Sequence, residues 1–528
     1  MNPFVSLYKS MVKKPKLGTN IDDIIERVKI MRKTTNINEY LQLHTSINHR
    51  DTCILHTEYV KIFNLITSKI IGFDVQIDKL LFPIEEYEYE ILKPISSIIK
   101  GVVIDGSISA IEKHLESQIR WNPQLAADNQ DRQQYMKTNL NINLDKPNNL
   151  PDFPSFEFID FFINETAYAF DMMKRDKKTG LFIIDTRFMS KYEHKPGFMK
   201  CGLCKAYFKL TKQQGFKLQY FKYNDTAYYR NNTKNAFIPL YSLYFDMLTY
   251  ITVCVHAIQT HYLVSANLMD KNTRYLPLEH PIRQLLLPTE LNCMTGYIGG
   301  QFVLFLKGSL FYNAFCYTDK GLTEMENDYI ANHRYDLFTN DTLFTKLHLF
   351  TEEMEYYPIN TYNVYYKMIN RLTDSFVEEC SSQGLMNDEV NTWLNMCYPN
   401  EDRPYGTSVK TIMKSIVRNM FFNSIQHKMI NNKNFVYTFM NYPALQLNET
   451  TEEYYIDLNI LNTTSILIIK ADADLIPMTK NMSFLITNKR LKRLVDTFHL
   501  EIKDLDDSYP SGFIQCLKPS GISYSVGI

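Results

Sequence analysis

The stretch from Phe237 to Thr289 constrains the fold of this chain more than any other. Its first half is almost continuously apolar and is long enough to cross a bilayer. It nevertheless contains Asp246 and runs into His256 and His261, polar side chains that a lipid-facing helix does not leave unpaired. The stretch is therefore predicted to be the buried central helix of a large soluble domain and to carry a metal site.

The spacing of His256 and His261 carries its own structural prediction. In a regular α-helix, residues five apart point about 140° away from each other, too far to bind one ion. A π-type turn of about 4.4 residues reduces this angle to about 50°. The H-x4-H spacing therefore predicts a local π-bulge, although this pair alone leaves open that the two are unrelated core histidines.

A second pair of candidate ligands lies far downstream. His427 and Asn431 are four residues apart and so share one face of an ordinary helix. An imidazole and a carboxamide oxygen side by side suit a borderline metal such as iron that keeps open positions. The chain then ends at Ile528 in a small apolar tail.

Taken together, these residues resemble the lipoxygenase family. Lipoxygenases hold one non-haem iron with H-x4-H followed by Leu-Val-Ser on one helix, H-x3-N on another, and the carboxylate of a C-terminal isoleucine. The run from Arg274 to Leu287 also looks like the family's R-x-L-P-x-x-H-P-x-x-x-L-L segment. The resemblance implies one Fe2+/Fe3+ cofactor with the ligands His256, His261, His427, Asn431 and Ile528.

The resemblance also implies a fold class and a domain organisation. We expect a mainly α, multi-helical catalytic domain with a long central helix and a small β-sheet, without the N-terminal PLAT β-barrel of animal and plant relatives. Alternation predicts strands at 180–185, 206–210 and 217–223. Because no Gly/Ser linker divides the chain, 1–528 is expected to be a single domain, with a divergent helical part (1–175) and an iron-binding part (176–528).

The activity implied by the resemblance is a dioxygenase of lipid metabolism that makes oxylipins. Its substrates are a polyunsaturated fatty acid and O2, and its product is a hydroperoxide. In the ferric state an iron-bound hydroxide, with no side-chain base, removes a bis-allylic hydrogen. By the same resemblance Gly300 controls stereochemistry and Leu304 clamps the pentadiene, although Gly299-Gly300 equally allows the interpretation that it only eases a bend. The radical chemistry needs a dry apolar pocket, which Leu285 and Leu286 are expected to line.

The net charge and the number of cysteines restrict the classes of binding partner and the cellular compartment that we expect. A net charge of −1, from 57 basic and 58 acidic residues, gives no long-range attraction to nucleic acid. Nine cysteines, an odd number, without a secretory signal favour a reducing, cytoplasmic location, with any membrane contact made peripherally by the catalytic domain. Cys201 and Cys204 form a C-x2-C, which we interpret as two incidental thiols because no second pair lies at zinc-site spacing.

Some positions depart from the family pattern and support alternative functions. Lys428 follows the third histidine where small residues are usual, Lys433 replaces a glycine, and Thr289 replaces a common histidine. Losses near metal ligands commonly reduce metal affinity or activity. The alternatives are a catalytically impaired lipoxygenase-like protein that binds lipids or partners, and an iron enzyme that processes fatty hydroperoxides.

Overall fold

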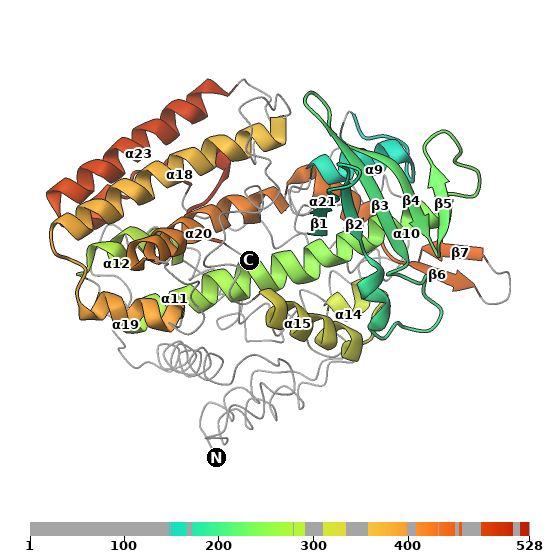
Figure 1. The fold of residues 1–528 in the computed structure, drawn as a ribbon, viewed down its shortest axis with the longest axis horizontal. Helices are drawn as coiled ribbons and strands as arrows, with labels where there is room; N and C mark the ends of the chain where they lie inside the picture. Colours follow the sequence, from blue (N-terminus) through green and yellow to red (C-terminus); the bar gives the residue numbers. More distant parts are fainter. Residues whose placement is uncertain are drawn as a thin grey trace, which may run out of the picture.

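A long central helix organises the molecule. The helices α10 (Phe237–Thr249), η4 (Tyr250–Ala266) and α11 (Asn267–Tyr275) follow one another without a break (Figure 1). Phe237–Met269 is long and apolar enough to span a membrane, yet 94% of its most apolar window is buried inside the protein. The predicted buried central helix is therefore confirmed. This computed structural model describes residues 147, 149–165, 172–277, 279–290, 310–333, 357–398, 408–430, 432–448, 453–456, 477–509 and 518–526.

Asp246 lies in the middle of this apolar helix and is fully paired. Its carboxylate accepts hydrogen bonds from the Thr186 hydroxyl (2.6 Å) and from the Gly202 backbone N–H (2.8 Å). Burial raises the pKa of this carboxyl to about 7, and the hydrogen bonds from Thr186, Gly202 and Cys201 act in the opposite direction. The polar group that excluded a lipid-facing helix thus anchors α10 to its neighbours.

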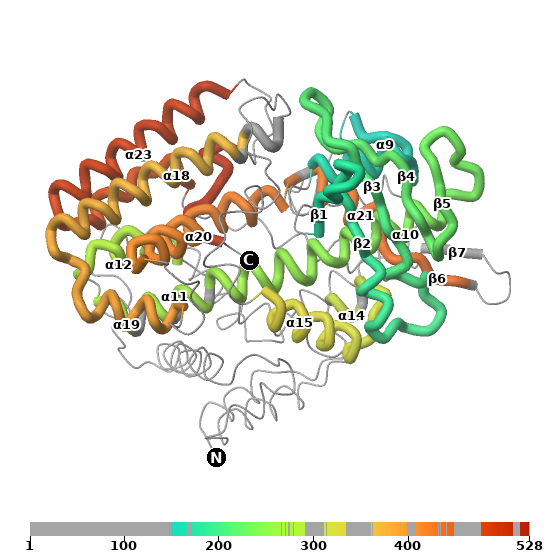
Figure 2. Tube along the Cα trace, in the orientation of Figure 1, coloured from blue at the N-terminus to red at the C-terminus, as the bar shows by residue number. Residues whose placement is uncertain are grey.

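Helices surround the central helix on the side away from the sheet. α20 (Val409–Ile430) packs along η4, and α18 (Tyr357–Ser382) packs between α20 and α23 (Lys489–Ser508). α19 (Asp388–Cys397) contacts α11, and α15 (Asp319–His333) contacts η4. Figure 2 shows the arrangement of these helices as a tube.

Capping and apolar spacing explain where such helices begin and what they bury. In α19 the side chain of Asn387 accepts a hydrogen bond from the Val390 N–H (3.1 Å), and two acidic residues follow it in the first turn. One turn further, Trp393 is fully buried and its indole N–H donates to the Asn272 side chain (2.7 Å). These contacts dock α19 on α11.

A five-stranded antiparallel sheet lies near the N-terminal end of the central helix (Figure 1). The strands follow the chain in order: β1 (Met173–Arg175), β2 (Phe182–Asp185), β3 (Cys204–Thr211), β4 (Gly215–Tyr223) and β5 (Thr226–Tyr229). The three strands predicted from alternation are confirmed, and β1 and β5 were not anticipated. The small sheet on a helical body agrees with the expected fold class.

The sheet packs its apolar side against helices. Ala206 and Phe208 are fully buried and alternate with less buried neighbours. β3 contacts α10, and β4 contacts α9 (Phe156–Glu165). Asn224 and Asp225 adopt positive φ (46° and 62°) in the tight turn from β4 to β5, which suits their short polar side chains.

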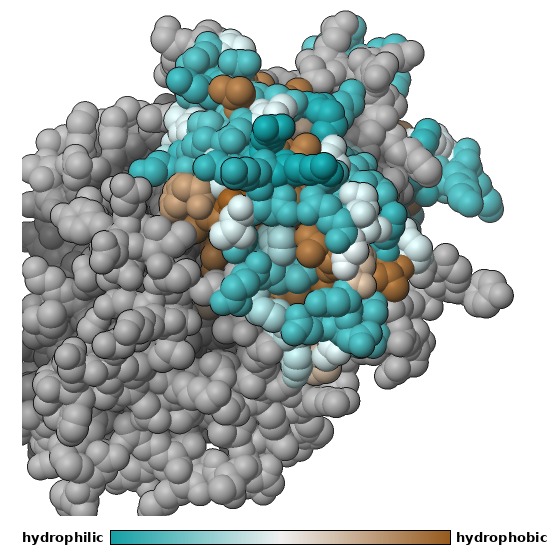
Figure 3. All heavy atoms as spheres, turned by 90° about the vertical axis from the view of Figure 1, so that its left-hand side faces the viewer, coloured by the Kyte–Doolittle hydropathy of each residue, from teal (hydrophilic) through white to brown (hydrophobic). Residues whose placement is uncertain are grey.

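On the side that faces left in Figure 1, the residues that the structure describes are mainly hydrophilic, with hydrophobic groups scattered between polar ones (Figure 3).

Short elements complete the described chain. The remaining elements are η3 (Arg187–Lys191), α12 (Pro281–Leu286), η5 (Leu287–Glu290), α14 (Leu310–Ala314), α21 (Lys433–Asn441), β6 (Leu445–Asn448), β7 (Glu453–Ile456), η8 (Ser483–Leu485) and η10 (Pro519–Gly521).

Candidate metal centre

A long π-helix brings two of the predicted ligands together. η4 is π-helical over all 17 of its residues, so the predicted local π-bulge is confirmed and is longer than one turn. At its end the Asn267 N–H donates to the Tyr262 carbonyl, five residues back, as π geometry requires. The Nε2 atoms of His256 and His261 consequently lie 3.1 Å apart.

The third histidine comes from α20, which packs along η4. The His427 ring lies 4.9 Å from the ring of His256 and 4.8 Å from that of His261, measured between centroids. One ring nitrogen of each histidine lies within 4.8 Å of a nitrogen of the other two. The structure thus gathers three imidazoles from segments more than 160 residues apart into a group that could hold one metal ion.

Electrostatics keep these three imidazoles neutral. Burial lowers the pKa of His261 to about 4 and holds the pKa values of His256 and His427 well below their ordinary range. The neighbouring histidines, and Lys428 beside His427, lower these pKa values further. A neutral imidazole is the form that ligates a metal.

The packing of the rings also fits a metal ion. His256 and His261 are half-buried, and His427 is buried. The 3.1 Å separation allows a hydrogen bond in which one Nε2 of the His256–His261 pair is protonated and the other accepts. A bound metal ion would take the place of that shared proton. The arrangement therefore suits a borderline divalent metal that accepts nitrogen ligands.

Asn423 holds the two metal-site helices in register. Its side-chain amide donates to the Thr260 carbonyl (3.0 Å), next to His261, and to the Ser265 hydroxyl (2.6 Å). Asn423 is fully buried and lies one turn before His427 on α20. Sequence reasoning missed this residue, although its position four residues before a predicted ligand places it on the same helix face.

The C-terminal segment lies beside the same helix. The Ser424 hydroxyl on α20 donates to the carbonyl of Tyr524, and Tyr524 and Val526 are buried. The Met478 N–H donates to the Ile522 carbonyl (2.8 Å), which ties the segment to the body of the protein. Ile528 and Asn431, the two remaining predicted ligands, lie outside the described residues.

The predicted pocket residues are only partly placed. Leu285 and Leu286 are buried on α12, which contacts α20. His280 begins this helix: its side chain accepts from the Ile282 N–H (3.2 Å), and its other ring nitrogen lies 3.1 Å from the Leu385 carbonyl. Gly300 and Leu304 lie outside the described residues, so their predicted roles stay predictions.

The residues that depart from the family pattern have local structural roles. The Thr289 hydroxyl donates to the Leu286 carbonyl (2.7 Å) and so satisfies a backbone group at the end of α12. Lys433 is the first residue of α21, whose N-cap is Asn432. Lys428 is partly buried directly after His427, and its positive charge lowers the pKa of that imidazole.

Comparison with known proteins gives structural matches only. No family model matches the sequence, and no curated protein matches it. A coral 8R-lipoxygenase structure superposes with a TM-score of 0.56 at 13% identity, covering 73% of this chain and 63% of the coral chain. The manganese lipoxygenase of Gaeumannomyces graminis gives 0.55 at 15% identity, covering 66% of this chain and 71% of that one.

A lipoxygenase deletion variant in complex with arachidonate gives a TM-score of 0.56 at 12% identity. This match covers 85% of this chain and 76% of the other. At such low identity the similarity concerns the arrangement of the backbone. The chain spans less than two thirds of the coral protein's length.

Proposed function

We propose that this chain, whose fold is lipoxygenase-like, is a non-haem iron dioxygenase that inserts O2 into polyunsaturated fatty acids. The observation that carries the proposal is the convergence of His256, His261 and His427, all held neutral, in a fold shared with lipoxygenases. Three neutral imidazoles suit a metal that must change oxidation state and keep an exchangeable position. Bound iron would supply one-electron oxidation of a bis-allylic carbon, to which O2 then adds.

The chain's own residues position the metal and exclude water. The three histidines would form one side of the coordination sphere, with Asn431 and the carboxylate of Ile528 completing it. Asn423 would fix the distance between the two histidine-bearing helices. Leu285 and Leu286 would line the apolar wall, Leu304 would press on the pentadiene, and Gly300 would leave space for O2.

The proposed substrate class follows from the same fold. One structural neighbour is a complex with arachidonate, a polyunsaturated fatty acid. A pocket for such a chain must be dry and apolar so that the radical is not quenched. We place the protein in a reducing, cytoplasmic compartment, peripheral on membranes when it meets its substrate; the six described cysteines are free and buried.

The decisive experiment measures metal and product together. Protein purified without a polyhistidine tag or any C-terminal addition should contain about one iron per chain. With linoleic or arachidonic acid it should develop conjugated-diene absorbance. His427→Gln should lose iron and activity together, whereas His499→Gln should retain both, because His499 lies partly exposed on α23.

Several outcomes would contradict the proposal. Metal-replete protein without diene formation would indicate the alternative of an impaired, lipid-binding lipoxygenase-like protein, which the cation of Lys428 beside His427 favours. Consumption of added fatty hydroperoxide without diene formation would indicate hydroperoxide processing. Manganese in place of iron would replace the metal in the proposal, since one structural neighbour is a manganese lipoxygenase.

A further inference from the structure

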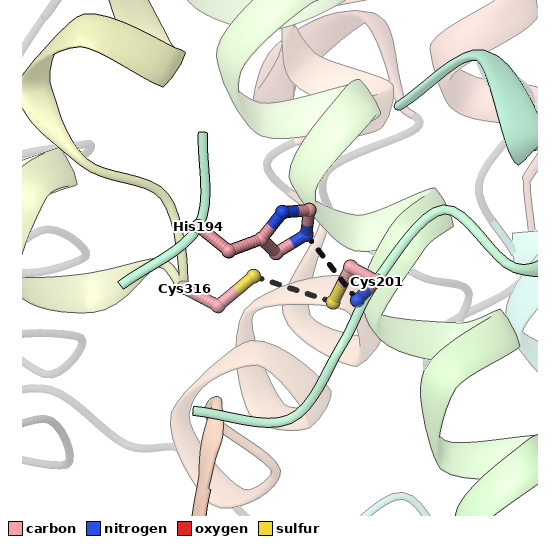
Figure 4. Close-up of side chains that lie close together, drawn as sticks. All are labelled: His194, Cys201 and Cys316. Atoms are coloured by element: carbon pink, nitrogen blue, oxygen red, sulfur yellow. Dashed lines mark hydrogen bonds between the residues drawn. The ribbon is translucent and has the colours of Figure 1, made fainter. Parts of the chain in front are cut away.

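A second group of metal-ligating side chains lies at the other end of the central helix. His194, Cys201 and Cys316 offer one nitrogen and two sulfurs that all lie within 4.8 Å of one another. The two Sγ atoms are 3.3 Å apart, and the Cys201 N–H donates to Nε2 of His194 (3.3 Å). Figure 4 shows the imidazole directed toward the two cysteines; His194 and Cys201 come from the β2–β3 connection and Cys316 from the segment between α14 and α15.

The backbone fixes the relative positions of two of these segments. His194 pairs with Tyr317 in an isolated antiparallel bridge. On either side of the bridge, the Lys195 N–H donates to the Cys316 carbonyl (2.8 Å) and the Thr318 N–H donates to the Glu193 carbonyl (3.0 Å). His194 and Cys316 therefore stay adjacent although they are 122 residues apart in sequence.

Two glycines allow the close approach that builds the cluster. A Cβ at Gly321, in the first turn of α15, would lie 2.3 Å from the Glu193 carbonyl oxygen. A Cβ at Gly202, directly after Cys201, would lie 2.2 Å from the Ser190 backbone nitrogen. Since neither backbone contact would accommodate a side chain, both segments that carry the cysteines are packed tightly beside His194.

The surroundings contain a buried polar group without a partner. Tyr317 is fully buried, its ring lies 4.5 Å from that of His194, and its hydroxyl has no hydrogen-bond partner among the residues that the structure describes. Burial raises the pKa of this hydroxyl, and the neighbouring Cys316 and Cys201 act in the same direction. A buried unpaired hydroxyl costs free energy, so it points to a polar ligand in this place.

We propose that His194, Cys201 and Cys316 bind a zinc ion, with a water molecule that hydrogen-bonds to Tyr317 as the fourth ligand. Zinc would take the place of the Cys201 N–H at Nε2 of His194. Thiolate sulfur and imidazole nitrogen are the preferred ligands of zinc. Binding releases one proton from each thiol, and the two thiolates then neutralise the charge of Zn2+ in the buried site. The ion would join two parts of the β2–β3 connection, which carry His194 and Cys201, to Cys316 in the segment between α14 and α15.

This site is independent of the three-histidine centre and of the activity proposed for it. A pair of thiols 3.3 Å apart could instead form a disulfide or remain reduced without metal. The test must therefore identify the metal, locate it and record the state of the thiols. Because zinc also binds imidazoles, the measurements are made on full-length protein that carries His427→Gln, without a polyhistidine tag.

In this background, protein purified from zinc-supplemented medium should contain about one zinc per chain by elemental analysis. Cys316→Ser and His194→Gln should each reduce zinc content at least tenfold and lower the melting temperature by several degrees. Cys380→Ser is the matched control, because Cys380 is another fully buried free cysteine but lies on α18; it should retain the zinc.

A thiol assay on the same protein covers the case in which a cluster variant does not fold. A mercurial reagent should release the zinc into a chromogenic chelator as two thiols react. Absence of zinc in the background protein, full zinc retention in both cluster variants, or a Cys201–Cys316 disulfide in non-reduced peptide mapping would each overturn the proposal. Loss of zinc in the Cys380→Ser control would overturn the location of the site.

Discussion

At the scale of single residues, the three histidines show how burial prepares a side chain for metal binding. Each imidazole is surrounded by protein that disfavours its charged form, so it remains a neutral ligand at physiological pH. Because the folded protein keeps these imidazoles neutral, its stability depends on pH. In the unfolded chain the same side chains bind protons below about pH 6.5.

We predict that these histidines make the metal-free protein less stable in acid. His261 has a folded pKa of about 4, so between about pH 6.5 and 4 the unfolded state binds more protons than the folded state. Stability from this residue is therefore present above pH 6.5 and is lost on acidification, by about 1.4 kcal/mol per pH unit at most. Urea unfolding of wild type and His261→Gln at pH 7.5, 6 and 5 measures the difference.

Asp246 changes the pH dependence of stability in the opposite direction, so wild type must be compared with His261→Gln. Its folded pKa is raised to about 7, so its contribution has the opposite sign and is lost as pH rises from 3.8 towards 7. Because both proteins retain Asp246, the difference between their pH profiles isolates His261. Parallel profiles for the two proteins would contradict the assignment of a neutral, buried imidazole.

At the scale of elements, close backbone contacts decide how the sheet meets the helices. The backbone of η3 and the residues directly before β3 approach so closely that only a glycine fits at position 202. Gly202 also has φ +75°, a conformation that side chains with a Cβ rarely adopt. Its amide N–H donates a hydrogen bond to the Asp246 carboxylate, as does the Thr186 hydroxyl.

We predict that Gly202→Ala destabilises the protein much more than Gly180→Ala. Both glycines have similar positive φ (75° and 71°), so each alanine pays about 1 kcal/mol of backbone strain. Only the alanine at 202 would also meet backbone atoms, whereas position 180 has nothing within 4 Å. We expect Gly202→Ala to cost at least about 2 kcal/mol more in unfolding free energy. Equal melting temperatures for the two variants would exclude the close packing.

At the scale of the whole molecule, the metal centre depends on segments from distant parts of the chain. The π-helix, α20 and the C-terminal segment meet around the histidines, with Ser424 bonded to the tail and Asn423 to the π-helix. The expected organisation as one domain over 1–528 stays a prediction, because it includes residues outside the described ranges.

We predict that residues added after Ile528 abolish metal binding without unfolding the protein. The extension removes the terminal carboxylate that the proposed iron site uses, while the buried Tyr524 and Val526 keep their contacts. Iron content should fall at least tenfold, with little change in the melting temperature of the metal-free form. An N-terminal extension of the same length is the control. Full iron content in the C-terminally extended protein would remove Ile528 from the ligand set.

The local sequence pattern was sufficient to predict much of this protein's structure. The H-x4-H spacing predicted the π-helical geometry of η4, alternation predicted three strands, and the apolar run around Asp246 predicted a buried core helix. These features are readable because they depend on residues within a few turns of one another. The resemblance of the histidine motifs indicated the fold, which the structural matches confirm.

Only the tertiary structure decided which distant groups meet. It joined Cys201 to Cys316 and His194, although in the sequence its obvious partner was Cys204, whose thiol instead bonds the Pro239 carbonyl. It likewise showed that Asn423 ties α20 to the π-helix. The physical reason is that such contacts arise from packing between elements more than a hundred residues apart, and no local period records where those elements will dock.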